Sequence, residues 1–329
     1  MFQGIFDRKT ISLNGMWDYR IDQNDIGKRQ SWYLTDYSGN GWRTIQVPGN
    51  WYLNEEIGDY FGTIWYKKDF RLTEKKGERI FVRFEGVDYI TEVWLNGKYL
   101  GFHEGMFNPF EFEITDFVDY DGNNTLIVRD CAPKDPTEFI EADNDETPLS
   151  DGYKFHQSKG ITQIKGHMIE AMHRPGCYSK YRMDGNSGGI WGNVSIVTKP
   201  EIFIENVKIF TKIDMNGDGR EYQDSAMASF DVYINSNCAK EKEIELGLDI
   251  TPYNFEQEMN CTVKRTVIVR PGSNRFKLTA RIEQVALWWT WDHGKPNLYT
   301  ASITAMEDHI STNFGVKEIH QDEKGQWYL

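Results

Sequence analysis

The chain has 329 residues, more than one ordinary domain needs, and this length predicts two domains of roughly 100 to 200 residues each. Lysine and arginine total 37 and aspartate and glutamate total 50, so the net charge is −13. This charge argues against nucleic acid and anionic membranes as partners, because phosphate groups are bound by clustered cations, and no apolar run approaches the roughly 18 residues that cross a bilayer.

The N-terminal stretch "MFQGIFDRKTISLNG" has no charged segment followed by an apolar one, so the chain as it begins carries no signal peptide. A bacterial cytoplasmic or periplasmic location is expected. The four cysteines lie far apart and form no C-x-x-C pair, which argues against a zinc site or a redox dithiol. Cys238 and Cys261 could pair within one domain, but four free thiols are the preferred interpretation.

Apolar and polar residues alternate with a period of two along the whole chain, which predicts strands with one side facing solvent. Asn96-Gly97, in "WLNGKY", separates two such runs and tolerates the positive φ of a type I′ hairpin. Helical periodicity over ten residues is hard to find, so the predicted fold class is an all-β sandwich. The clearest alternating runs are 80–85, 110–114, 228–234, 244–250 and 276–282.

A domain boundary is expected near Pro200, which separates a strand ending at Val197 from a new alternating run. This divides the chain into residues 1–199 and 200–317. Within the first part, residues 131–186 form an irregular loop, far longer than the roughly 12 to 15 residues at which structureless loops become uncommon. Such a loop is usually either disordered or functional.

Two stretches resemble metal sites. In "DMNGDGREYQDS", Asp214, Asn216 and Asp218 hold the first positions of a calcium-loop pattern, but the final position is Ser225 instead of a bidentate Glu, and strands flank it. A polar hairpin is the preferred interpretation and calcium the weaker alternative. The long loop holds histidines and a cysteine whose spacing matches no known ligand set, so no metal and no cofactor are predicted. These residues are His156, His167, His173 and Cys177.

Several stretches resemble, in this order, the N-terminal sugar-binding domain of glycoside hydrolase family 2: "ISLNGMWDYRID", "IQVPGNWYL", "GTIWYKKDF", "RIFVRFEGVDYITEVWLNGKYLGFHEGMFNPFEFEITDFV", "NNTLIVRD" and "SGGIWGNVSIV". "LWWTWDHGKPNLYTASITA" and "FGVKEI" resemble the family's immunoglobulin-like domain. The family includes β-galactosidases, β-glucuronidases and β-mannosidases. The resemblance implies a galactose-binding-domain-like jelly roll at 1–199, followed by an immunoglobulin-like sandwich at 200–317.

In this family, "FGVKEI" and a short strand resembling "GQWYL" open a (β/α)₈ barrel that carries the chemistry, so residues 318–329 resemble a lead-in to a barrel absent from this chain. Retaining hydrolysis needs two carboxylic acids about 5 to 5.5 Å apart, and the family places both as Glu on that barrel. No catalytic residue is therefore expected here. Asn54-Glu55 matches the dipeptide at the family's acid/base, but its position implies a surface loop.

The resemblance also implies sugar contacts from the first domain. An Asp before the S-G-I-W stretch reaches the sugar in some members, and Asp184 matches it within about one residue. The family's β-galactosidases supply an Asn before the "WY" strand; here Asp59 stands nearby instead, which puts β-galactosidase activity in doubt. Tyr178 and Tyr181 are candidate platforms for sugar C–H faces, or alternatively anchors for their own loop.

The resemblance implies the non-catalytic N-terminal part of a retaining β-glycosidase of carbohydrate metabolism. Its expected partners are a carbohydrate substrate, through the barrel, and further copies of the full-length enzyme. A free-standing carbohydrate-binding module is the alternative, but such a module has no reason to carry "KEIHQDEKGQWYL". The tryptophans are expected to be structural, with Trp288, Trp289 and Trp291 where the family packs this domain on its neighbours. The others are Trp17, Trp42, Trp51, Trp65, Trp94 and Trp191.

Overall fold

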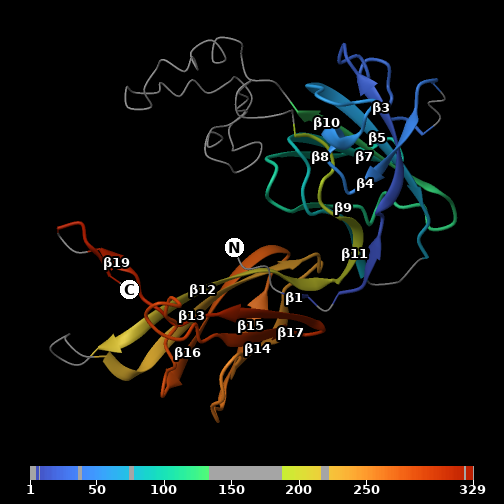
Figure 1. The fold of residues 1–329 in the computed structure, drawn as a ribbon. Helices are drawn as coiled ribbons and strands as arrows, with labels where there is room; N and C mark the ends of the chain where they lie inside the picture. Colours follow the sequence, from blue (N-terminus) through green and yellow to red (C-terminus); the bar gives the residue numbers. More distant parts are fainter. Residues whose placement is uncertain are drawn as a thin grey trace, which may run out of the picture. The chain divides into compact units, whose positions relative to one another are not determined.

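The computed structural model describes residues 5–6, 8–35, 39–73, 78–132, 187–215, 222–321 and 324–328 (Figure 1). These residues form two compact units. The first is Lys9–Thr198, and the second is Lys199–Leu329 together with the N-terminal segment Met1–Arg8. Both units are β-sandwiches, as the period-two alternation predicted.

The larger sheet of the first unit has the strand order β4-β3-β5-β10-β7-β8. Its described pairings are antiparallel, and central strand β10 pairs with both β5 and β7. The predicted hairpin joins β7 to β8. Its turn residues Asn96 and Gly97 have φ values of 51° and 76°, and a type I′ turn needs positive φ at both positions. The strands are β3 (Gly15–Asp22), β4 (Arg43–Val47), β5 (Gly62–Phe70), β7 (Ile90–Leu95), β8 (Lys98–Glu104) and β10 (Asn124–Ala132).

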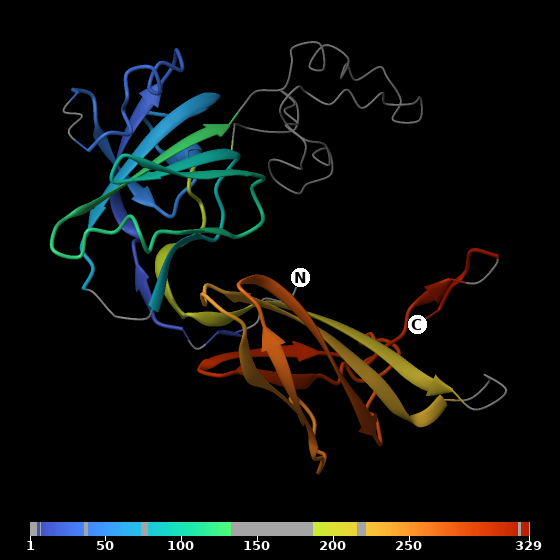
Figure 2. The ribbon, with the colours of Figure 1, turned by 180° about the vertical axis from the view of Figure 1, so that it is seen from behind.

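The smaller sheet of the first unit has the order β2-β11-β6-β9. Inward-facing side chains of both sheets form one buried cluster, which includes Trp17, Tyr66 and Phe84. This jelly-roll sandwich is seen from behind in Figure 2. The strands are β2 (Thr10–Ser12), β6 (Glu78–Phe84), β9 (Phe110–Glu113) and β11 (Val194–Pro200).

The other face of the six-stranded sheet carries a second cluster, built from Trp32, Trp65 and Trp94. Trp65 lies between the core residues Ile64 and Tyr66, and so faces away from the main core. The Trp65 and Trp94 rings stack with centroids 5.4 Å apart, and Trp32 meets Trp65 edge-on at 5.9 Å. Asp22, at the end of β3, accepts a hydrogen bond from the Trp65 ring nitrogen.

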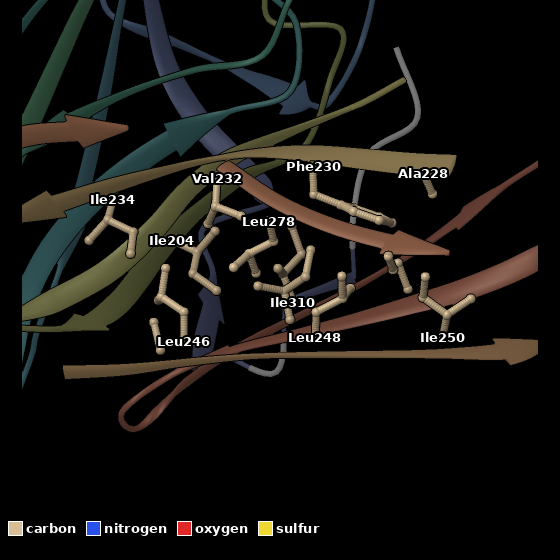
Figure 3. Close-up of a cluster of buried hydrophobic side chains, with 14 of the residues drawn as sticks. Ile204, Ala228, Phe230, Val232, Ile234, Leu246, Leu248, Ile250, Leu278 and Ile310 are labelled. Carbon is tan, nitrogen blue, oxygen red and sulfur yellow. The ribbon is translucent and has the colours of Figure 1, made fainter. Parts of the chain in front are cut away.

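The second unit packs a five-stranded sheet, β1-β18-β17-β14-β15, against a three-stranded sheet, β12-β13-β16. Each alternating run predicted for this unit places its apolar side in the shared core (Figure 3). Ala228, Phe230, Val232 and Ile234 on β13 are fully buried. The strands are β1 (Ile5–Phe6), β12 (Ile202–Met215), β13 (Tyr222–Ser236), β14 (Lys242–Pro252), β15 (Cys261–Val269), β16 (Gly272–Glu283), β17 (Tyr299–Ala305) and β18 (Asp308–Phe314).

The N-terminal segment differs from the sequence expectation, which assigned residues 1–199 to the first domain. Ile5 and Phe6 pair with β18, so β1 extends the sheet of the second sandwich. The chain therefore passes from the second unit into the first at Lys9 and re-enters the second unit at Lys199. The two connections run together, because the Thr198 amide donates to the Lys9 carbonyl at 3.0 Å. A two-residue strand carries too little periodicity to reveal a partner about 300 positions away.

The remaining boundaries also differ slightly. β11 continues to Pro200 rather than ending at Val197. In residues 318–329, β19 (His320–Gln321) pairs with β20 (Trp327–Tyr328) in a separate two-stranded ladder. Within the described part of the chain, no helix is long and apolar enough to span a membrane.

Candidate functional site

Most of the sequence-predicted sugar contacts lie outside the described residues, namely Asp184, Tyr178 and Tyr181, and the same holds for the loop histidines and Cys177. Asp59 is described. It is exposed and lies between the 3-10 helix η1 (Trp51–Leu53) and β5. The site can therefore be built from Asp59 and from the two ends of the long loop, β10 and residue 187 onward.

Residues 187–190 return to the sandwich through a short ladder of backbone hydrogen bonds. The Trp51 amide donates to the Gly188 carbonyl, and the Gly49 amide to the Ile190 carbonyl, both at 2.9 Å. Gly189 and Asp88 exchange two backbone hydrogen bonds, at 3.0 and 3.2 Å. The exit of the loop is thereby held on the segments that follow β4 and β6.

Asp130 connects the two ends of the loop. It is fully buried near the end of β10, and its carboxylate accepts the Gly189 amide at 3.0 Å and the Tyr89 amide at 3.0 Å. Hydrogen bonds from backbone amides stabilise a buried carboxylate, so these amides offset part of the cost of removing Asp130 from water. The end of β10 and the segment that begins at residue 187 thus meet at Asp130.

Trp51 links this place to Asp59. A β-carbon on Gly188 would lie 2.2 Å from two carbons of the Trp51 ring, so only glycine lets the returning chain lie on the indole. On its other side Trp51 packs against Tyr60, with ring centroids 6.1 Å apart. Asp59 directly precedes Tyr60. The segment bearing Asp59 and the exit of the loop therefore share one tryptophan.

Two tyrosines lie near these residues, Tyr66 near Asp130 and Tyr60 against Trp51. Burial raises the pKa of Tyr66 well above its ordinary value, and the negative charge of Asp130 raises it further. Burial also raises the pKa of Tyr60. Both tyrosines therefore stay protonated near neutral pH and add no negative charge beside Asp130 and Asp59.

The Asn54-Glu55 dipeptide has the contacts of a turn. Asn54 caps the end of η1, and its side-chain oxygen accepts the Glu56 amide at 3.0 Å. Glu56 pairs with Arg43 at 3.1 Å and accepts the Tyr19 hydroxyl at 3.0 Å, while Glu55 is exposed. This geometry supports the surface-loop interpretation.

Asp214 contacts two protein side chains. Its carboxylate accepts the Ser225 hydroxyl at 2.7 Å and pairs with Arg281 at 3.1 Å. Asp214 and Ser225 lie on the paired strands β12 and β13, as the hairpin interpretation predicted, while Asn216 and Asp218 lie outside the described residues. Across the described ranges, no group of three or more His, Cys, Asp or Glu side chains could hold a metal.

The aromatic and sulfur side chains mostly have structural positions. Cys131, Cys238 and Cys261 are free thiols. Trp191 is 38% exposed and its ring nitrogen donates to the Met106 carbonyl, while Trp291, where the resemblance places a neighbouring domain, is 89% exposed. The other tryptophans predicted as structural in the first domain are buried or half-buried, namely Trp17, Trp42, Trp51, Trp65 and Trp94.

A jelly-roll sandwich and an immunoglobulin-like sandwich define the class of this protein, a chain of two β-sandwich domains. The pattern described as "Glycosyl hydrolases family 2, sugar binding domain" matches residues 10–156, and that described as "Glycosyl hydrolases family 2" matches residues 203–317. The chain belongs to glycosyl hydrolase family 2, in its sugar-binding and immunoglobulin-like domains.

Relatives of this chain include enzymes of two kinds. A β-galactosidase of Thermoanaerobacter pseudethanolicus is 25% identical over 334 residues, covering 98% of this chain and 37% of that protein. A β-glucuronidase of Sus scrofa is 24% identical over 320 residues, covering 90% and 41%. The chain thus spans about two fifths of the length of these two relatives.

Solved structures share the fold. The β-glucuronidase of Bacteroides uniformis superposes with a TM-score of 0.65 at 18% identity, covering 96% of this chain and 33% of that one. A β-glucuronidase of an uncultured Clostridium species superposes with a TM-score of 0.62 at 21% identity, covering 96% and 46%.

Proposed function

We propose that this chain is the non-catalytic N-terminal part of a retaining β-glycosidase that hydrolyses O-glycosidic bonds in carbohydrate metabolism. The observation that carries the proposal is the order of the two family matches, which together extend from residue 10 to residue 317. In this proposal residues 318–329 lead into a catalytic barrel, the two sandwiches support that barrel, and the whole enzyme forms homo-oligomers.

The long loop and the Asp59 segment lend one wall to the sugar pocket in this proposal. The contacts of Asp130 and Trp51 support this wall. Asp130 holds the exit of the loop, and Trp51 contacts both that exit and the residue after Asp59. Asp184 and Asp59 would accept hydrogen bonds from sugar hydroxyls. Tyr178 and Tyr181 would pack on sugar C–H faces.

Hydrolysis of nitrophenyl β-glycosides tests the proposed activity. The galactoside, glucuronide, mannoside and glucoside are offered to this chain and to the full-length protein side by side. We expect only the full-length protein to turn over one of them, which also names the sugar. Activity of the 329 residues alone would overturn the proposal and return Glu55 to consideration.

Kinetics of the full-length protein test the proposed wall. Asp184→Ala and Asp59→Ala should each lower kcat/KM while leaving Tm unchanged, because an exposed acid that binds substrate contributes little to folding. Glu55→Ala is the matched control, since Glu55 is an exposed acid on the same η1–β5 connection as Asp59. Unchanged kinetics for an aspartate variant would remove that residue from the pocket.

A second candidate function is a carbohydrate-binding module that holds sugar without a catalytic partner. The match of residues 10–156 to a sugar-binding domain supports it. It predicts saturable micromolar binding of a sugar by this chain alone. The glycosidase proposal predicts binding of monosaccharides no tighter than millimolar, because one wall of a pocket buries little ligand surface.

A further inference from the structure

Two exposed aromatic rings meet on the surface of the first sandwich. Phe107, in the connection between β8 and β9, is 41% exposed, and Trp191, just before β11, is 38% exposed. Their ring centroids are 6.2 Å apart and their planes are inclined by 65°. The rings therefore form an angled aromatic surface in contact with solvent.

Backbone contacts hold the Trp191 ring in place. Its ring nitrogen donates to the Met106 carbonyl at 3.1 Å, which ties it to the residue before Phe107. A β-carbon on Gly86 would lie 2.6 Å from two carbons of the ring, so the indole lies directly on the backbone there. The Gly192 amide donates to the Gly86 carbonyl at 2.9 Å and fixes the next residue as well. The Trp191 ring is thus held in place before any ligand arrives, which reduces the entropy cost of binding.

Polar residues are neighbours of Trp191 along the chain and across the backbone pairing. Trp191 and Asn193 are both exposed while Gly192 between them is buried, so the two side chains lie on the outward side of the extended segment. The Asn193 carbonyl accepts the Glu85 amide at 2.9 Å, which makes Glu85 its neighbour. Arg83 pairs with the Glu85 carboxylate at 2.8 Å. The Asn193 side-chain oxygen also accepts the Asn14 amide group at 2.9 Å, so the exposed amide two residues from Trp191 is held in place.

We propose that Phe107 and Trp191 form a platform for one pyranose ring of a β-linked glycoside. The sugar stacks its axial C–H groups on one ring, meets the second ring at its edge, and directs equatorial hydroxyls toward Asn193 and Glu85. Rigid aromatic rings bordered by polar groups suit a sugar because its faces are apolar and its rim is polar. The inference deepens the proposed function, on which it rests, by naming a second subsite for an extended carbohydrate.

Fluorine NMR of the 329-residue chain, labelled with 5-fluorotryptophan, tests the platform. Trp191→Phe identifies the Trp191 resonance, and methyl β-D-galactopyranoside and methyl β-D-glucuronide are titrated separately. We expect at least one sugar to shift this resonance with saturation in the millimolar range. A linear shift with both sugars, equal to the shift that glycerol causes at the same concentration, would overturn the platform.

Variants locate the binding. Phe107→Ala should weaken the affinity roughly two- to tenfold, the scale of one aromatic contact, while Phe107→Tyr should preserve it. Phe102→Ala is the matched control, because Phe102 is a more exposed phenylalanine of the same sandwich and should leave the Kd unchanged. An unchanged Kd in Phe107→Ala would contradict the inference.

The binding test is independent of hydrolysis. If the full-length protein cleaves a β-glycoside but Phe107→Ala binds sugar normally, the platform is wrong and the proposed function stands. If Phe107 supports binding but the full-length protein cleaves none of the nitrophenyl glycosides, the glycosidase proposal fails and the platform stands.

Discussion

Arg8 and Asp308 are 300 positions apart in the sequence and form a two-point ion pair inside the second sandwich. The Arg8 Nε–Asp308 Oδ1 distance is 3.0 Å and the Nη2–Oδ2 distance is 2.7 Å. Arg8 also donates to the Ile204 carbonyl, and Asp308 accepts the Ile204 amide, each at 2.6 Å. The N-terminal segment, β12 and the start of β18 are thus joined by one buried pair.

Arg8→Ala should lower the free energy of unfolding of the second sandwich by about 3 kcal/mol, because it leaves the Asp308 carboxylate buried without its charged partner. The two side chains are 6% and 3% exposed, so water cannot replace the guanidinium. The loss of stability is measured by hydrogen exchange of the β12 and β18 amides as the urea concentration is raised. Arg270→Ala is the control, since Arg270 pairs with Glu241 in solvent and should change stability by less than about 0.5 kcal/mol. Equal effects of the two variants would contradict the prediction.

Asp22→Ala should destabilise the first sandwich by roughly 2 to 4 kcal/mol, because three N–H donors lose their acceptor. The buried carboxylate accepts the Ile26 and Gly27 amides at 2.8 Å and the Trp65 ring nitrogen at 2.9 Å. Urea denaturation and a red shift of tryptophan emission report the change. The exposed Asp116→Ala should leave both unchanged. A loss below about 0.5 kcal/mol in Asp22→Ala, the range of ordinary surface changes, would mean that water replaces the carboxylate.

Gly188→Ala should destabilise the first sandwich by about 1 to 3 kcal/mol, since the new methyl group overlaps the fully buried Trp51 ring. Gly122→Ala is the matched control. Its methyl group would meet the exposed Asp119 carboxylate instead of a buried ring, and a shift of that carboxylate weakens the hydrogen bonds it accepts from the Asp121 and Gly122 amides, so a smaller loss is expected. Thermal unfolding of both variants compares the two sites. A Tm for Gly188→Ala equal to that of the control would show that Trp51 moves aside at no cost.

His103 should make the first sandwich less stable in mild acid. Burial lowers the pKa of His103, although the Gly105 backbone and the Glu104 charge oppose the shift, and its ring stacks on Phe110 at 4.1 Å. The unfolded chain then binds this proton more readily than the folded one, so stability is present above the ordinary pKa of about 6.5 and is lost as pH falls below it.

Urea denaturation between about pH 7 and pH 5 measures the effect of His103 around its ordinary pKa. His103→Gln should flatten the pH dependence of the first sandwich, because the titrating ring is removed. His309→Gln changes a histidine of β18 in the other unit and should leave that profile as it is. An unchanged slope in His103→Gln would assign the pH dependence to other groups.

Much of each sandwich was predictable because its signals are local. Ile244, Leu246, Leu248 and Ile250 alternate with polar residues and are buried together on β14. The Asn96-Gly97 turn has the positive φ angles that its composition predicted. In both cases neighbouring residues carry the whole physical cause, which is the pleat of a strand or the sterics of a turn.

The candidate site was only partly predictable. The length of the irregular stretch identified the long loop and the resemblance pointed to Asp59, but neither identified Asp130 as the buried carboxylate that joins the loop ends. A weak signal for Asp130 was present, because an aspartate that follows the apolar run of β10 needs hydrogen-bond donors once buried. No local signal distinguished Phe107 from the other aromatic residues on the surface.

The sequence by itself determined the all-β class, the strand faces, the family and the hairpin turn, since each depends on residues a few positions apart. Only the tertiary structure decided that β1 joins β18, that Arg8 pairs with Asp308, and that Phe107 lies against Trp191. The aromatic pair joins residues 191 − 107 = 84 positions apart, and the ion pair joins residues 300 positions apart. Such contacts form only when sheets and distant segments pack together. They leave no periodic pattern in the sequence, so they cannot be predicted from it.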